Sequence, residues 1–396
     1  MNYRKFSAER IFNNGEWVEN SVLITSDDGR VEAIVPLTDA GEGLQRVEGF
    51  LTPGFINCHC HLELSHMKGR VPEGTGLVDF VYHIVTGRHS SPDEIAEAIG
   101  RAEDEMLRTG TVAVGDICNN TNTLEQKKKR RLHYSNFVEA SGWLPSAAEA
   151  RLGQVLSVYE AFRQEGEVAR NAERYFRTAL VPHAPYSVSA ELWARIRPYM
   201  NGKTVSIHNQ ETAFEDEFFL QGTGDFNRMY QMMNMDNSHH QPHRKTSLQS
   251  YYSSLSGASS ILLVHNTFTG GHDMDFIRTE MGEGAPATFF CLCINANQYI
   301  ERSLPPVRLL REKGLPVVLG TDSLASNHSL RLIEEVNTIR SAFPEVPLEE
   351  VLLWATANGA KALQMDDVLG SFDGGKKPGI VQVTHEQGRL EACRLL

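Results

Sequence analysis

Short apolar and β-branched runs alternate with turn residues at both ends of the chain. These runs lie at residues 17–18, 22–24, 31–35, 369–372 and 379–384. Small antiparallel strands joined by tight turns have this pattern. We therefore predict one small β-sandwich domain, formed by residues 1–50 together with residues 365–396.

From residue 51 to residue 364, apolar runs alternate with longer amphipathic segments. The candidate strands are the run that leads to His59 and residues 111–118, 133–139, 176–183, 204–208, 260–265, 287–293 and 316–321. Strands that alternate with helices predict an α/β fold with a parallel sheet, and eight such units fit a closed (β/α)8 TIM-like barrel. We predict that residues 51–364 form this barrel.

One long excursion interrupts the alternation, at residues 215–256 between the fifth and sixth strands. It is rich in methionine and contains His239, His240 and His243. A segment of this length on the active-site side of a barrel is expected to act as a lid. The three histidines could bind a metal, but a mobile, solvent-facing loop is the favoured interpretation.

The composition is that of an ordinary globular protein, and the net charge argues against some classes of binding partner. Hydrophobic residues make up 41% and charged residues 22% of the 396 residues, and the net charge is −12. This charge argues against a nucleic-acid groove or an anionic membrane surface, and we expect the basic run at residues 127–131 on a solvated helix face. We find no apolar stretch of membrane-spanning length and no hydrophobic signal region near the N-terminus. Six cysteines are too few for a disulfide scaffold, so we expect a protein of the reducing cytoplasm.

Two histidines lie at the end of the run that enters the first barrel strand. Successive side chains of a strand point to opposite faces, so His59 and His61 share one face while Cys58 and Cys60 share the other. The histidines sit at the carboxyl end of the strand, where such barrels place their chemistry. We predict that the pair forms half of a divalent-metal site and that the cysteines pack as small hydrophobic residues against helices.

Four more polar residues directly follow apolar runs, at the ends of other candidate strands. They are His183, His208, His265 and Asp322. Imidazole nitrogen and carboxylate oxygen suit zinc, iron and manganese alike, and catalytic sites keep one position open for water. We predict one divalent cation, with zinc favoured. The predicted ligands are His59, His61, His208 and Asp322.

A cation bound there would lower the pKa of its water from about 15.7 to about 7. Asp322 would accept the proton as the resulting hydroxide attacks, and His265 would orient the hydroxide. Glu211 lies three residues beyond His208 and would reach the same pocket without binding the metal. A carboxyl group there can protonate a heteroaromatic ring nitrogen. The alternative for Glu211 is a carboxylate in the first turn of a helix.

The order and spacing of these motifs resemble the amidohydrolase superfamily, in particular its mononuclear deaminase and chlorohydrolase branch. The motifs are residues 54–61, His208-x-x-Glu211, residues 263–266 and residues 320–323. Binuclear members carry a carboxylated lysine near the fourth strand, where this chain has His183, so the resemblance implies one metal. It also implies a homodimer.

Two further segments resemble the adenosine-type, S-adenosylhomocysteine and aminodeoxyfutalosine deaminases of this branch. Residues 182–187 resemble the strand-four segment whose histidine contacts substrate, which implies that role for His183. Residues 62–65 resemble aminodeoxyfutalosine deaminases more than guanine or S-adenosylhomocysteine deaminases. The place of Glu63 just beyond the first strand predicts a second substrate contact, although a capping or salt-bridged carboxylate is an equal alternative. The strand-seven region lacks a motif common in the branch, so its pocket-lining residues stay open among Cys291, Cys293, Asn295 and Asn297.

The leading hypothesis is a metal-dependent hydrolase that deaminates an aminated purine or related heterocycle through metal-bound hydroxide. The favoured substrate is a 6-aminopurine nucleoside such as aminodeoxyfutalosine, adenosine or S-adenosylhomocysteine, and the expected catalytic residues are Glu211, His265 and Asp322. The same site would also suit hydrolytic dechlorination or hydrolysis of a cyclic amide or imidazolone ring. A non-catalytic barrel that keeps a metal is the alternative from another class.

Overall fold

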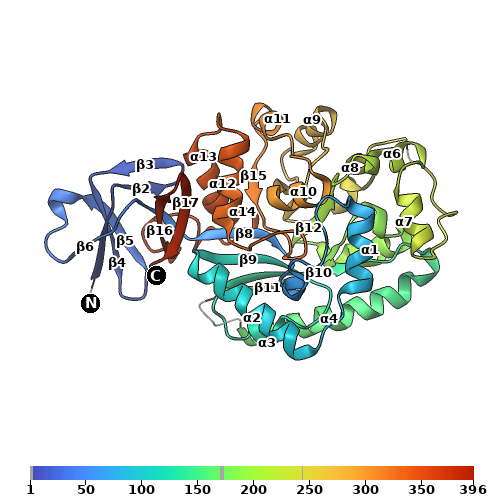
Figure 1. The fold of residues 1–396 in the computed structure, drawn as a ribbon, viewed down its shortest axis with the longest axis horizontal. Helices are drawn as coiled ribbons and strands as arrows, with labels where there is room; N and C mark the ends of the chain where they lie inside the picture. Colours follow the sequence, from blue (N-terminus) through green and yellow to red (C-terminus); the bar gives the residue numbers. More distant parts are fainter. Residues whose placement is uncertain (1–2, 170–173, 243) are drawn as a thin grey trace.

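A computed structural model describes residues 3–169, 174–242 and 244–396 (Figure 1). Parallel strands form two sheets within these ranges, in the orders β11-β10-β9-β8 and β12-β13-β14-β15. The strands are β8 (Phe55–Cys60), β9 (Thr111–Cys118), β10 (His133–Ala140), β11 (Phe176–Pro182), β12 (Thr204–Asn209), β13 (Ser260–His265), β14 (Ala287–Leu292) and β15 (Val317–Leu319). Each strand predicted within residues 51–364 is present, and the predicted α/β class with parallel sheets is confirmed.

The two parallel sheets meet along both of their edges. On one side, the backbone N–H groups of Thr321 and Asp322 each donate to the carbonyl oxygen of His59 at 3.0 Å. On the other side, the N–H of His208 donates to the carbonyl oxygen of His183 at 3.0 Å. The carboxyl ends of β8, β11, β12 and β15 therefore come together, an arrangement that fits a TIM-like barrel.

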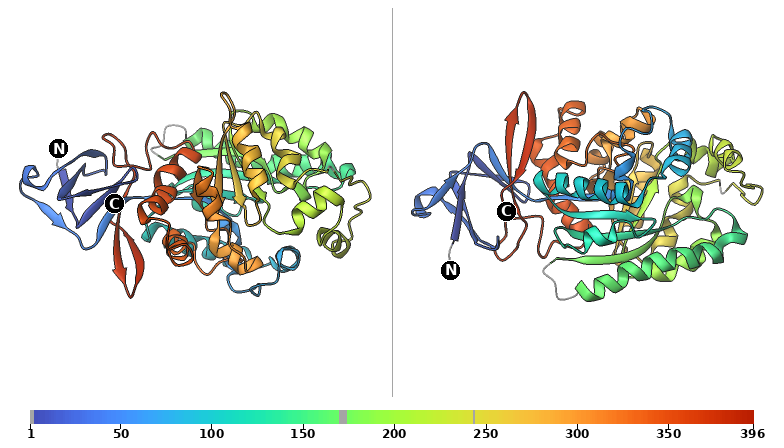
Figure 2. Two further views of the ribbon diagram at one scale, coloured as in Figure 1. Left: turned by 90° about the horizontal axis from the view of Figure 1, so that it is seen from above. Right: turned by 60° about the horizontal axis from the view of Figure 1, so that its bottom comes forward.

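Helices lie outside the parallel strands, and the long helix α4, green in Figure 2, runs along β10 and β11. The helices are α1 (Leu77–Gly87), α2 (Pro92–Arg108), α3 (Leu124–Lys127), α4 (Ala148–Val168), α5 (Ala190–Met200), α6 (Phe214–Gln221), α7 (Phe226–Met232), α8 (Ser247–Tyr251), α9 (Gly271–Glu280), α10 (Ile294–Glu301), α11 (Val307–Glu312), α12 (Leu332–Ala342), α13 (Leu348–Leu353) and α14 (Gly359–Ala362). All six residues of β8 are buried, as expected for a strand covered on both faces. Helix α2 begins with a capping box between Ser91 and Glu94.

The chain ends build two further sheets at one end of the molecule (Figure 1). Their strand orders are β5-β4-β1-β6 and β17-β16-β7-β2-β3. The strands are β1 (Tyr3–Ser7), β2 (Arg10–Asn13), β3 (Glu16–Glu19), β4 (Ser21–Ser26), β5 (Val31–Pro36), β6 (Leu44–Arg46), β7 (Phe50–Pro53), β16 (Ile380–Glu386) and β17 (Arg389–Arg394). A small apolar core contains Phe6, Leu23, Leu51 and Ile380, so both ends of the chain share it.

The strand predicted at residues 369–372 is wrong. Gly370 has a left-handed φ of +86°, and the N–H of Phe372 donates to Oδ1 of Asn13 at 2.7 Å. This segment is apolar because Phe372 packs into the small core of the chain ends, not because it pairs with another strand.

The basic run at residues 127–131 also departs from expectation at its first residue. Lys127 is fully buried, and its Nζ lies 2.5 Å from Oδ2 of Asp116. Lys128 and Lys129 are exposed, as predicted. The pattern of charges alone could not distinguish Lys127 because its partner lies on β9.

The excursion at residues 215–256 contains most of α6 and all of α7 and α8. The ring of His240 stacks on that of Phe218 with centroids 4.0 Å apart. The ring centroids of His239 and Trp143 lie 5.1 Å apart. His243 lies outside the described residues. The lid function of residues 215–256 stays a prediction. Within the described ranges, no helix is long and apolar enough to cross a membrane.

Candidate metal centre and active site

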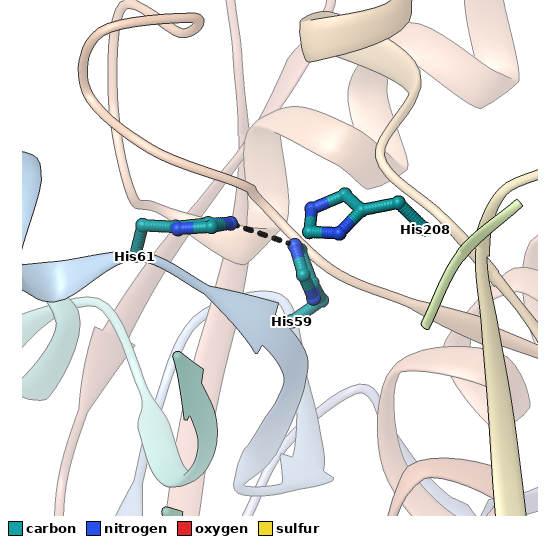
Figure 3. Close-up of side chains that lie close together, drawn as sticks. All are labelled: His59, His61 and His208. Carbon is teal, nitrogen blue, oxygen red and sulfur yellow. Dashed lines mark hydrogen bonds between the residues drawn. The ribbon is translucent and has the colours of Figure 1, made fainter. Parts of the chain in front are cut away.

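The centre of the site is the histidine pair at the end of β8 (Figure 3). The Nε2 atoms of His59 and His61 lie 3.1 Å apart. Two Zn–N bonds of about 2.0 Å at a tetrahedral angle would separate their nitrogens by about 3.3 Å. The pair is therefore spaced as two ligands of one cation. The Sγ of Cys58, on the other face, lies 3.8 Å from the carbonyl oxygen of Gly359 at α14, as predicted.

The third imidazole, His208, enters from β12 on the opposite sheet (Figure 3). Its Nδ1 lies 2.8 Å from the carbonyl oxygen of His183. A carbonyl can only accept, so Nδ1 carries the proton and Nε2 keeps a free lone pair. His59, His61 and His208 each offer a ligand atom, and these atoms lie within 4.8 Å of one another.

Asp322 supplies the carboxylate of the cluster. Its Oδ1 lies 3.3 Å from Nε2 of His61 and 3.7 Å from Nε2 of His59, while Oδ2 accepts from Oγ of Ser326 at 2.5 Å. The segment that leads to Asp322 can pack closely against His59 because residue 320 is glycine. A Cβ at Gly320 would lie 2.9 Å from Cβ of His59. The predicted ligands His59, His61, His208 and Asp322 are thus brought together.

Three residues at or just beyond strand ends have left-handed backbone conformations. Gln210, His265 and Asp322 have φ values of 44°, 72° and 57°. Such conformations cost about 1–3 kcal/mol each in residues other than glycine and concentrate at functional sites. Here they follow or end β12, β13 and β15. The surrounding contacts must hold them, since none of these residues prefers this region.

His265 and Glu211 form an acid–base pair beside the cluster. Nε2 of His265 lies 3.6 Å from Oε1 of Glu211. The side-chain amide of Asn297 donates to the carbonyl oxygen of His265, and its Oδ1 lies 2.8 Å from Nδ1 of His265. This arrangement puts the proton of His265 on Nδ1 and leaves Nε2 as an acceptor.

Burial sets the protonation states at the centre. It lowers the pKa of His59 and His208 well below the ordinary value, and neighbouring imidazoles add to the effect. Burial, followed by the charge of Asp322, raises the pKa of Glu211 well above its ordinary range. Neutral imidazoles are the form that binds a cation, and a protonated Glu211 is the form that donates a proton.

His183 lies at the edge of the centre, its ring centroid 4.7 Å from that of His208. The hydroxyl of Ser187 donates to the carbonyl oxygen of Ala184 and lies 2.7 Å from Nδ1 of His183. The hydroxyl therefore accepts from Nδ1, so Nε2 of His183 is free to accept a hydrogen bond from a ligand.

Glu63 lies in the 3₁₀ turn after β8 and is tied to a neighbouring loop. Its Oε2 accepts from the backbone N–H groups of Asn119 and Asn120 at 3.0 Å and 3.3 Å. Burial, followed by the charge of Asp116, raises the pKa of Glu63 to about 7. These bonds match the capping alternative, while substrate contact stays a prediction.

Comparison with known proteins identifies the chain's relatives. The model of the Amidohydrolase family matches residues 50–390. The chain belongs to this family. An adenosine deaminase from Helicobacter pylori is 26% identical over 333 residues, which cover 83% of this chain and 77% of that protein. The predictions of an amidohydrolase and of a hydrolase acting on carbon–nitrogen bonds are confirmed.

Two solved amidohydrolase-like structures share the fold. Aminofutalosine deaminase from Helicobacter pylori, in complex with methylthio-coformycin, has a TM-score of 0.78 and 23% identity, covering 96% of this chain and 91% of that one. An adenosine deaminase from Xanthomonas campestris with bound zinc has a TM-score of 0.71 and 20% identity, covering 97% and 85%. At these identities the likeness shows the fold alone.

Sequence reasoning missed several polar side chains at this amidohydrolase centre. Oε1 of Glu139, at the end of β10, lies 3.5 Å from Nδ1 of His208. The sequence pattern that identified His208 also applies to Glu139, since each of these polar residues ends an apolar run. Asn297 orients His265, whereas Asn295 bonds to Glu335 instead. Cys291 and Cys293 are fully buried.

Proposed function

We propose that this chain is a deaminase that hydrolyses the exocyclic amine of a 6-aminopurine nucleoside. The observation that carries the proposal is the pair of Glu211 and His265, 3.6 Å apart and buried beside a cluster of three imidazoles and a carboxylate. Ring protonation by a carboxyl group is what an aminated heterocycle requires before water can add to the carbon that bears the amine.

The residues present fit one divalent cation. The ligands we propose are His59, His61, His208 and Asp322, because their donor atoms converge and burial keeps the imidazoles neutral. Zinc is the favoured ion, since three imidazoles and one carboxylate suit it. When bound, such a cation supplies an activated water near neutral pH.

The side chains of the chain then divide the proton transfers. Glu211 donates its proton to the ring nitrogen, which makes the adjacent carbon electrophilic. Nε2 of His265 accepts a hydrogen bond from the attacking water and orients it. Asp322 takes the proton that water loses and returns it to the amine, so the carbon–nitrogen bond breaks and ammonia leaves. Water supplies the oxygen of the 6-oxopurine product, and the hydroxyl proton that remains on this oxygen returns to Glu211 as the carbonyl group forms.

The proposed substrate contacts are based on the position of His183 and on a nearby cluster of aromatic side chains. We propose that His183 accepts a hydrogen bond from the nucleoside through Nε2 and that Glu63 is a second contact. An aromatic cluster (Trp143, Tyr186, Phe218, Phe226 and Tyr230) lies in the segments that follow the carboxyl ends of β10, β11 and β12. This cluster favours a nucleoside with an uncharged 5′ substituent. Relatives named as deaminases of adenosine and aminofutalosine support the substrate class.

The proposal also includes the domain architecture of the protein. We infer that β8 to β15 close into a (β/α)8 barrel over residues 51–364, and that residues 1–50 and 365–396 form the β-sandwich domain. A homodimer in the cytoplasm remains our expectation for the assembled protein.

Ammonia release from purified, zinc-loaded protein tests the function. Adenosine, 5′-methylthioadenosine and S-adenosylhomocysteine serve as substrates, and the Glu211→Gln protein serves as the inactive control. We expect ammonia and the 6-oxopurine product in equal amounts, with 5′-methylthioadenosine preferred to S-adenosylhomocysteine. Chloride release from a chlorinated triazine, or ring opening of an imidazolone without ammonia from any purine, would refute the proposal.

A further inference from the structure

Tyr186 is a buried tyrosine whose hydroxyl group has no protein partner. It lies in the 3₁₀ turn Pro185–Ser187 after β11 and is 2% exposed. Within the described ranges, no hydrogen-bond partner is found for its Oη. The other tyrosines that are at most 5% exposed have one. For example, Oη of Tyr251 donates to Asn209 at 2.7 Å, and Oη of Tyr252 lies 2.7 Å from Oγ1 of Thr288. The ring is buried, but Oη is not among the fully buried, unpaired side-chain atoms of the described residues, so its O–H stays accessible to a ligand.

The excursion after β12 holds the ring of Tyr186 in place. Phe226 of α7 stacks on it with centroids 4.0 Å apart and an interplanar angle of 25°. Oη of Tyr230, also on α7, donates to the backbone carbonyl oxygen of Tyr186 at 2.5 Å. With both the ring and the backbone fixed, the hydroxyl cannot swing away to find another partner.

The ring of Tyr186 lies beside the proposed active site. The ring of Tyr186 meets that of His183 edge-on, with centroids 6.2 Å apart. Burial, and then the nearby carboxyl groups of Glu211, Glu215 and Glu139, raise the pKa of Tyr186 well above its ordinary value. The hydroxyl group of Tyr186 therefore remains an O–H donor, on a ring that lies next to His183.

We propose that Tyr186 is a further substrate-binding residue, whose hydroxyl donates a hydrogen bond to an acceptor atom of the bound nucleoside. The inference rests on the proposed function. The acceptor is either a purine ring nitrogen or a ribose oxygen, which present the same chemistry to an O–H donor. Because Phe226 and Tyr230 position the ring, the proposal also explains why α7 must pack against the loop that carries His183.

The test replaces Tyr186 with phenylalanine, which removes only the oxygen. For 5′-methylthioadenosine we expect KM to rise about two- to tenfold, the range for one neutral hydrogen bond, with kcat changed less than KM. The same factor should separate the Kd of 5′-methylthioadenosine for Glu211→Gln protein and for Glu211→Gln/Tyr186→Phe protein. The melting temperature should not fall, because no protein hydrogen bond is lost.

Tyr252→Phe is the matched control, since that hydroxyl has a protein partner and lies away from the site. It should lower the melting temperature and leave KM unchanged. Parallel assays with 7-deaza and 2′-deoxy analogues of the substrate identify the acceptor, because the analogue that lacks it should be insensitive to Tyr186→Phe.

Equal KM and equal Kd in the Tyr186→Phe proteins would overturn the inference, as would a melting temperature lowered as in Tyr252→Phe. A failure of the proposed function would look different: the wild-type protein would release no ammonia, although the Kd comparison would still report whether Tyr186 contacts a nucleoside.

Discussion

Lys127 and Asp116 form a buried ion pair beside β8, the strand that leads to His59 and His61. Its disruption should be strongly destabilising. Both side chains are fully buried, and Nζ of Lys127 lies 2.5 Å from Oδ2 of Asp116. Nζ also donates to Oδ1 of Asn136 at 2.8 Å. The other carboxylate oxygen, Oδ1 of Asp116, accepts from the backbone N–H of Leu62 at 2.8 Å, directly after His61. The pair therefore anchors the turn that follows His59 of β8 and His61 just beyond it.

Methionine at position 127 keeps most of the apolar stem and removes the charge. The variant leaves the carboxylate of Asp116 buried without its cation, and removing one partner of a buried pair costs about 3–5 kcal/mol. We therefore expect Lys127→Met to lower the free energy of unfolding by this amount. The double variant Asp116→Asn/Lys127→Met has no unpaired charge and keeps an acceptor for Leu62, so it should recover about half of the loss or more.

Equilibrium urea unfolding of the chelator-treated proteins measures these differences without a contribution from metal binding. Lys128→Met is the matched control, because Lys128 is 41% exposed and pairs with the exposed Glu125. It should change stability by no more than about 0.5 kcal/mol. A Lys127→Met protein as stable as the control, or a double variant no better than the single one, would refute this account of the pair.

Three further predictions address catalysis, pH and substrate preference. Glu211→Gln should lower kcat by about 10²–10⁴-fold while bound metal, measured by elemental analysis, stays unchanged. Burial raises the pKa of Glu335 to about 7, so the folded state keeps a proton that the unfolded state releases near pH 4.5 and stability should fall by about 3 kcal/mol between these values. Glu335→Gln should remove this contribution to the pH dependence of urea unfolding at pH 5, 6 and 7, while those of Glu63 and Glu211 remain. A pH dependence parallel to that of the wild-type protein would contradict it. Phe226→Leu should raise KM for 5′-methylthioadenosine by removing the stacking on Tyr186, and an unchanged KM would exclude α7 from substrate binding.

The sequence predicts the parallel strands well because each one is an apolar run bounded by turn residues, and burial on both faces makes that pattern continuous. Residues 111–118 and 260–265 match β9 and β13 completely. The failure at residues 369–372 has a tertiary cause. Phe372 bonds to Asn13, a residue 359 positions away, which no local pattern can indicate.

The proposed metal-binding cluster is predictable for a related reason. The end of a parallel strand is a local position, and polar residues there stand out against the apolar run. His59, His208 and Asp322 are all of this kind. Residues whose importance depends on distant partners are not visible in the same manner. Lys127 looks like one member of a basic run, and the free hydroxyl of Tyr186 is evident only when the contacts of every buried tyrosine are compared.

The most direct test of the central claim is ammonia release from 5′-methylthioadenosine by protein freed of metal with a chelator, assayed before and after zinc is restored, with bound zinc measured in the same samples. The account predicts negligible turnover in the chelated protein and recovery as the bound zinc approaches one ion per chain. Undiminished ammonia release from protein that contains negligible metal would contradict it.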